Sequence, residues 1–206
     1  MSRAEIIDTV VRFEWEDVIG LRMAGGGPAC ENNPDTFSRL RRALLETWSE
    51  ELLESYLGDL AAARSSHRSL AREKYAWMGE GADDRAFVDA APMLPLLPYE
   101  TCERIERILK FLVLWQAQAM ERFPRVTAGG RPLVTEDDWD GLVSIETYRR
   151  AELRVCSPRT IELYEAYVLE CWHAGTNLAI AYLDNVARSY GYRGVCDAES
   201  GGEPPR

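Results

Sequence analysis

The sequence predicts an all-α protein, a single domain of about six main helices with irregular connections rich in glycine and proline. Apolar residues recur at helical spacing along most of the chain, and almost no stretch alternates as a half-buried strand does. The 206 residues are 46% hydrophobic and 28% charged, which suits one globular domain with a sizeable core. We expect residues 1–196 to form this domain and residues 197–206 to be a disordered tail. The six main helices are expected over residues 2–21, 36–64, 66–78, 99–123, 136–155 and 158–186.

Start and stop signals support the helices of the N-terminal half. The first helix leads into a Gly-Gly-Gly-Pro loop at 25–28, which ends the helical pattern. Asp35 or Thr36 provides an N-cap for the second helix, and a serine pair at 65–66 provides one for the third. The third helix is expected to stop at Gly79, and a short extra helix follows over residues 86–90.

Similar signals support the helices of the C-terminal half. Pro124 ends the fourth helix, because proline lacks the amide hydrogen that a helix interior requires. Thr135 with Asp138 resembles a capping box for the fifth helix. A Ser-Pro pair at 157–158 is a strong start for the sixth, with serine as the cap and proline in the first helical position.

Charge and hydropathy exclude several classes of function. The net charge is −10, and the chain has no basic stripe to neutralise phosphates, so we expect no nucleic-acid partner. The longest apolar run, Phe111–Trp115, is far too short to cross a bilayer, and the first residues contain no apolar signal core. We therefore expect a cytoplasmic protein that does not bind a membrane.

Motifs for cofactors are missing from the sequence. The five cysteines are scattered and form no C-x-x-C pair, and only two histidines are present, so we expect no metal site. The 25–30 loop lacks the Lys-Ser/Thr of a phosphate-binding loop, and no motif for a flavin or another nucleotide is present. The cofactor, if the protein uses one, is unknown at this point.

Three predicted helices carry a charged residue in the middle of an apolar stripe. Glu14 lies at the centre of the first stripe, Lys74 lies among the apolar residues of the third helix, and Glu146 lies in line with those of the fifth. Burying an unpaired charge costs several kcal/mol, roughly, even after relaxation, so such residues normally face water. We expect Glu14 and Lys74 to meet each other or other polar groups. Arg149 and Arg150 follow Glu146 at helical spacing and offer it an ordinary local partner.

Three further residues are candidates for substrate binding. Arg131 lies in a Gly-Gly-Arg-Pro turn and could bind an anion, although solvated turn arginines are common. His67 precedes Lys74 by about two turns, and gains interest only if Lys74 is functional. Cys30 follows three glycines and could be an exposed thiol, but no partner base lies near it in sequence.

Several short segments also occur in a recognisable order from the first helix to the last. They are Glu14-Trp15, the 25–30 loop, Thr36-Phe37, Leu53, Ser55-Tyr56, Asp59-Leu60, Glu73-Lys74-Tyr75-Ala76, Gly130-Arg131-Pro132, Ser144-x-Glu146-x-Tyr148, Glu152-Leu153 and Gly191-Tyr192. Their order resembles the bacterial family DUF4125, a domain of unknown function. The stretch His-Arg-Ser-Leu at 67–70 departs from the family's Gly-Arg-Asn-Leu form, and Val143 stands in place of threonine. The resemblance implies a cytosolic bacterial protein and brings no established activity.

Two hypotheses for function follow. In the first, the protein is an enzyme or a small-molecule-binding protein for a small polar, amino-acid-like substrate. Glu14 and Lys74 then act as acid and base or pair with substrate charges, Glu146 orients them, and the turn and loop residues border the site. In the second, the protein is a helical interaction or scaffold protein whose buried charges specify packing, and its partner could be a second copy. A solvent-reachable pocket bordered by the charged residues favours the first hypothesis, and a closed, fully bonded knot favours the second.

Overall fold

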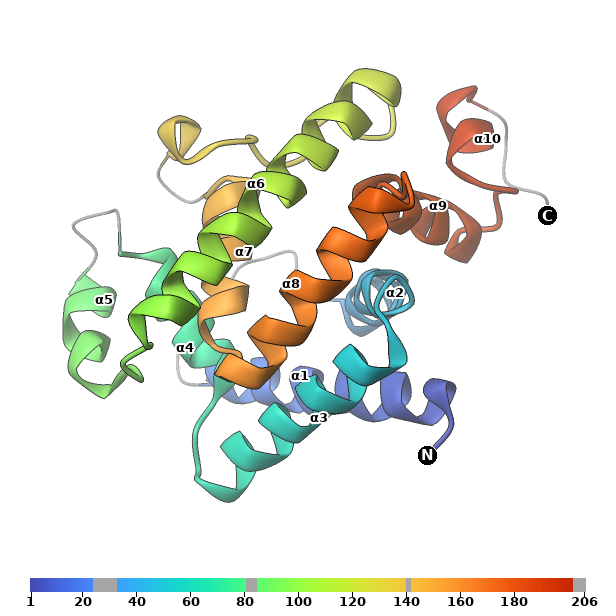
Figure 1. Ribbon diagram of the computed structural model, residues 1–206. Helices are drawn as coiled ribbons and strands as arrows, with labels where there is room; N and C mark the ends of the chain where they lie inside the picture. Colours follow the sequence, from blue (N-terminus) through green and yellow to red (C-terminus); the bar gives the residue numbers. More distant parts are fainter. Residues whose placement is uncertain (24–32, 81–84, 140–141, 202–206) are drawn as a thin grey trace.

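The computed structural model describes residues 1–23, 33–80, 85–139 and 142–201, and this part of the chain is mostly helical (Figure 1). The helices are α1 Arg3–Met23, α2 Pro34–Leu45, α3 Glu50–Ser65, α4 Leu70–Met78, α5 Arg85–Ala90, α6 Tyr99–Arg122, α7 Ile145–Arg154, α8 Pro158–His173, α9 Leu178–Ser189 and α10 Val195–Glu199. Two 3-10 turns, Ala91–Met93 and Thr135–Asp137, join them, and the described ranges contain no strand beyond one isolated bridge between Trp139 and Leu142. The all-α prediction is confirmed. The described residues form ten helices where six main helices were expected. Two predicted helices are each divided in two, α5 corresponds to the short extra helix that was expected, and α10 was not expected.

The predicted helix over 36–64 is two helices, α2 and α3. The side chain of Ser49 accepts a hydrogen bond from the Leu52 amide and so caps α3, while the chain turns between Leu45 and Glu50. The apolar spacing continues through the break because Trp48 remains in the core, 7% exposed. A continuous apolar pattern therefore concealed a turn.

The predicted helix over 158–186 also divides, into α8 and α9. Gly175 has a φ of +69°, a left-handed conformation that glycine adopts without a steric penalty. Asn177 then caps α9 by accepting a bond from the Ile180 amide, and its own amide group donates to the Trp115 carbonyl on α6. The break thus holds α9 against α6.

The fifth predicted helix begins about nine residues later than expected. Thr135 starts a 3-10 turn, and the N-cap of α7 is Ser144, which accepts a bond from the Thr147 amide. Asp138 does not form a capping box with Thr135. Its carboxylate accepts bonds from the Ser144 amide and the Thr147 hydroxyl, so it supports the later start.

The expected disordered tail is wrong for its first residues. Asp197–Glu199 belong to α10, and the Glu199 carboxylate accepts bonds from the amides of Arg125 and Val126 after α6. At the other end of α10, the Val195 amide donates to Asp184 on α9. The helix is therefore attached at both ends, and residues 202–206 lie outside the described ranges.

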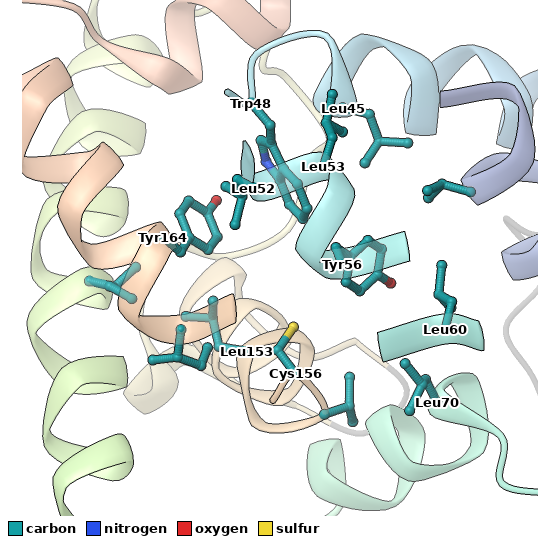
Figure 2. Close-up of a cluster of buried hydrophobic side chains, with 14 of the residues drawn as sticks. Leu45, Trp48, Leu52, Leu53, Tyr56, Leu60, Leu70, Leu153, Cys156 and Tyr164 are labelled. Atoms are coloured by element: carbon teal, nitrogen blue, oxygen red, sulfur yellow. The ribbon is translucent and has the colours of Figure 1, made fainter. Parts of the chain in front are cut away.

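The helices enclose a core that is shared along the chain. Helix α1 packs against α2, α3 and α4, while α6 packs against α7, α8 and α9. Figure 2 shows the core where these groups meet, with Leu52 of α3 and Trp48 beside Tyr164 of α8. The Tyr56 hydroxyl points away from Tyr164, toward the side of the core where α1 and α4 meet. The polar residues of the candidate site gather on that side.

Candidate functional site

The centre of the candidate site is a buried ion pair between Glu14 of α1 and Arg41 of α2. Arg41 donates from Nε to Glu14 Oε2 at 2.8 Å and from Nη2 to Oε1 at 2.6 Å, a two-point fork. The Tyr56 hydroxyl donates a third bond to Oε1 at 2.7 Å. Both carboxylate oxygens of Glu14 are therefore bonded, and only 11% of its side chain is exposed. This explains how a charge survives at the centre of an apolar stripe.

The row of charges continues from Arg41 into α7. Arg41 Nη1 donates to Glu152 Oε1 at 2.9 Å, and Glu152 Oε2 accepts from Arg149 Nη1 at 2.6 Å. Acidic and basic groups thus alternate in the order Glu14, Arg41, Glu152, Arg149. We call these four residues the charge row. It ties α1, α2 and α7 together, and it carries no net charge.

Burial and partners shift the proton affinities in the row. Burial opposes the charge of Glu152, but Arg149, Arg41 and Lys74 outweigh it and lower the pKa of Glu152 to about 2. Burial also opposes the charge of Arg41, while Glu14 and Glu152 raise its pKa well above the usual value. Burial and the Glu14 carboxylate raise the pKa of Tyr56 well above its usual value, so Tyr56 stays neutral and donates. Glu152 and Arg41 therefore carry their charges near neutral pH.

Lys74 of α4 lies beside the row but contacts aromatic residues. Its Nζ lies 3.2 Å from the Tyr148 hydroxyl, 4.8 Å from the centre of the Tyr148 ring and 4.9 Å from that of Tyr75. Arg131 lies over the same Tyr148 ring at 4.8 Å, and it donates to the Val143 carbonyl. Tyr148 is thus flanked by two cations, a favourable contact for an electron-rich ring.

These groups border a partly enclosed cavity of about 60 Å³, large enough for several water molecules. Its polar wall consists of Glu14, Asp17, Arg41, Lys74, Arg149, Glu152, Tyr56, Tyr148 and Tyr164. Apolar residues that include Val18, Phe37, Leu60, Leu70 and Leu112 form the rest. A cavity that combines an apolar wall with a few charged groups is typical of small-molecule sites.

The structure brings together only part of the predicted site. Glu14 and Lys74 both line the cavity, but they do not pair with each other: Glu14 pairs with Arg41, and Lys74 contacts Tyr148. Glu146 does not line the cavity. It accepts bonds from Arg150 at 2.6 Å and from the Thr135 amide at 3.1 Å, so its local partner accounts for it.

Two of the predicted substrate-binding residues, His67 and Arg131, lie apart from the cavity. His67 is exposed in the turn between α3 and α4, with a φ of +54°, and does not line the cavity. Arg131 borders a separate, open hollow near the end of α6 and reaches the site only through Tyr148. Cys30 lies outside the described residues.

Sequence reasoning missed Arg41, Glu152, Arg149 and Asp17. Arg41 lies four residues after buried Phe37 and four before buried Leu45, which is the pattern that identified Glu14. Glu152 lies four residues before buried Cys156 and directly precedes buried Leu153. The same test, applied to every helix, would have found Arg41 and Glu152.

The described ranges contain neither a membrane-spanning helix nor a metal-binding cluster. Each helix there is too short or too polar to pass through a lipid bilayer. No three metal-binding side chains of His, Cys, Asp or Glu gather in that part of the chain.

Comparisons with curated proteins and with solved structures gave no match. One family model does match, over residues 4–200, and its description is "Protein of unknown function (DUF4125)". The match begins at the second residue of α1, continues past the end of α10 and includes every residue of the charge row. The chain belongs to the DUF4125 family.

Proposed function

We propose that the protein is a cytoplasmic bacterial enzyme or small-molecule-binding protein, whose ligand is a small polar, amino-acid-like molecule held in the cavity beside the charge row. The observation that carries the proposal is the state of Arg149. Its Nη1 donates to Glu152, and no described residue accepts a bond from its Nε or Nη2. Nε and Nη2 form the same fork with which Arg41 binds Glu14. Arg149 can therefore bind a ligand carboxylate at two points.

Lys74 supplies a second positive charge at the cavity wall. Because it lies beside Tyr148, these two side chains can hold or move a proton at the ligand if the protein is an enzyme. Glu14 has another role in this proposal. Both its oxygens are occupied, so it positions Arg41 and through Arg41 the rest of the row. Glu146 has no part in it.

One observation favours a second candidate, a scaffold in which the buried charges specify packing. The carboxylates of Glu14 and Glu152 and the guanidinium of Arg41 form hydrogen bonds with one another, with Tyr56 or with Arg149. Such mutual bonding is what a buried ion cluster with a purely structural role requires. A scaffold could use the same helices to bind a second copy. This candidate does not account for the Nε and Nη2 of Arg149, which lie at a cavity and have no acceptor among the described residues.

The test measures the binding of acetate, propanoate and butanoate by calorimetry and by the shift in melting temperature. We expect at least one of these carboxylates to bind the natural chain, and Arg149→Met to weaken that binding tenfold or more. Arg150→Met is the matched control, because Arg150 adjoins Arg149 in sequence but pairs with Glu106 and Glu146 away from the cavity.

Stability decides whether the comparison is fair. Arg149→Met leaves Glu152 paired with Arg41, so we expect this variant to remain folded. Binding that is unchanged in Arg149→Met, or no binding of any carboxylate to the natural chain, refutes the proposal and leaves the scaffold candidate.

A further inference from the structure

Asp17 is an acidic residue of the cavity wall that the charge row does not use. It follows Glu14 by one helical turn, so the two side chains emerge on the same face of α1. Its Oδ2 accepts a bond from the Ala71 amide at 2.9 Å, in the first turn of α4. No donor among the described residues reaches its Oδ1. One of its oxygens therefore has a structural partner, and the other has none within that part of the chain.

Capping of α4 does not depend on Asp17 alone. The Ser69 side chain accepts a bond from the Arg72 amide at 3.1 Å and is the N-cap of the helix. Asp17 adds a bond to a neighbouring amide. An uncharged acceptor would serve that amide equally well, so the negative charge of Asp17 is not explained by the cap.

The cavity wall carries charges of both signs outside the charge row. The two acids and two bases of the row neutralise one another, and Asp17 and Lys74 remain as the other charged residues of the wall. The acid lies on α1, while Lys74 and the Nε and Nη2 fork of Arg149 lie on α4 and α7. A ligand with one charge of each sign matches this arrangement.

We infer that Asp17 is a specificity-determining residue that binds the ammonium group of a zwitterionic ligand, whose carboxylate is held by Arg149. This inference rests on the proposed function, and it adds the residue that binds the amine of the ligand and selects for it. The apolar wall, with Val18 and Phe37, then faces the carbon skeleton of the ligand. An acid without the amine leaves Asp17 unpaired beside the ligand, which lowers its affinity.

The test compares three pairs of probes with the same carbon skeleton: glycine with acetate, β-alanine with propanoate, and 4-aminobutanoate with butanoate. Butylamine serves as an amine without a carboxylate. Affinities are measured by calorimetry for the natural chain, Asp17→Asn and Ser69→Ala. Asparagine retains a carbonyl oxygen for the Ala71 amide, so the cap is preserved while the charge is removed. Ser69→Ala weakens the cap without changing the cavity wall.

We expect the natural chain to bind at least one amino acid tenfold more tightly than its parent acid. In Asp17→Asn that preference should fall below twofold, while the affinity for the parent acid stays within twofold of the natural value. Ser69→Ala should retain the preference. If Asp17→Asn does not fold, Asp17→Ser is measured in the same way, because a hydroxyl can also accept the amide bond.

Each failure has its own signature. Equal binding of amino acids and parent acids by the natural chain overturns the role of Asp17 and leaves the carboxylate site intact. A preference that survives in Asp17→Asn has the same meaning. Binding of butylamine without any carboxylate, lost in Asp17→Asn, supports Asp17 and overturns the carboxylate site at Arg149. Absence of binding by every probe overturns both.

Discussion

Replacing Arg41 with methionine should destabilise the protein strongly, because Arg41 is the central cation of the charge row. Its guanidinium donates three hydrogen bonds, at 2.8, 2.6 and 2.9 Å, to two carboxylates. Side-chain exposure is only 14% for Arg41, 11% for Glu14 and 17% for Glu152. Methionine has a similar length and no charge, so among the described residues Arg41→Met leaves Tyr56 as the donor to Glu14 and Arg149 as the donor to Glu152.

The expected loss is about 4 kcal/mol, since removing one partner of a buried ion pair typically costs about 3–5 kcal/mol. That is a large part of the roughly 5–15 kcal/mol that holds a typical domain folded. Urea unfolding followed by circular dichroism at pH 7 measures it. Arg12→Met is the control, because Arg12 pairs with Glu16 at 3.4 Å on the exposed side of α1, where a pair contributes at most about 1 kcal/mol.

The double variant Arg41→Met with Glu14→Gln provides the decisive comparison. It removes one of the two carboxylate charges that have lost Arg41, so the double variant should be more stable than Arg41→Met alone. The coupling free energy between the two substitutions should be about 1 kcal/mol or more. The reasoning is refuted if Arg41→Met loses no more stability than Arg12→Met, or if the effects of the two substitutions simply add.

Two further predictions concern stability alone. The pKa of Glu152 is lowered from its ordinary value of 4.5 to about 2, so between these pH values the unfolded chain holds a proton that the native chain lacks. The stability that this group contributes is complete above about pH 4.5, and about 3 kcal/mol of it is lost as the pH falls through 2. Unfolding free energies measured from pH 6 to 2 should show this decline for the natural chain, and the decline should be smaller for Glu152→Gln. The same pH dependence in both proteins would contradict the lowered pKa of Glu152. Gly175→Ala should cost about 1–2 kcal/mol, because its φ of +69° disfavours a side chain, whereas Gly58→Ala in α3 meets nothing within 4 Å and should stabilise by up to about 1 kcal/mol. Chemical unfolding of both variants checks the pair, and a stabilising Gly175→Ala would contradict the account of the α8–α9 break.

The helical class of this chain could be predicted because most apolar residues repeat at helical spacing. The breaks were harder, since the apolar pattern continues across them. Ser49 and Gly175 are ordinary signals for a helix start and a helix end, but neither interrupts the stripe of buried residues around it. Periodicity reports which face is buried, whereas capping chemistry reports where a helix ends. The two signals have to be weighed separately.

The candidate site was predictable only in part, for a physical reason. Glu14 and Lys74 could be recognised because each is a charge in an apolar stripe. Their partners could not be chosen, because Glu14 meets Arg41 across 27 positions and Arg41 meets Glu152 across 111. Which residues pair across such long separations in sequence depends on how the helices pack. Opposite charge alone suggested that Glu14 pairs with Lys74, while a guanidinium fork could bind both carboxylate oxygens at once and left Lys74 to the aromatic ring of Tyr148.

The arrangement of charges separates two roles that a buried polar cluster can combine. Glu14, Arg41 and Glu152 have their hydrogen bonds satisfied by protein groups, so changes in them should act first on stability. Arg149 bonds to Glu152 through Nη1, and Asp17 accepts a bond from the Ala71 amide through Oδ2. The other polar atoms of these two side chains have no hydrogen-bond partner among the described residues. A group held in this way keeps its geometry without a ligand, and this preorganisation favours tight binding. Ligand binding should therefore depend on Arg149 and Asp17, whereas stability should depend on Glu14, Arg41 and Glu152. If variants of the two groups changed ligand affinity and unfolding free energy to the same extent, the two roles would not be separate.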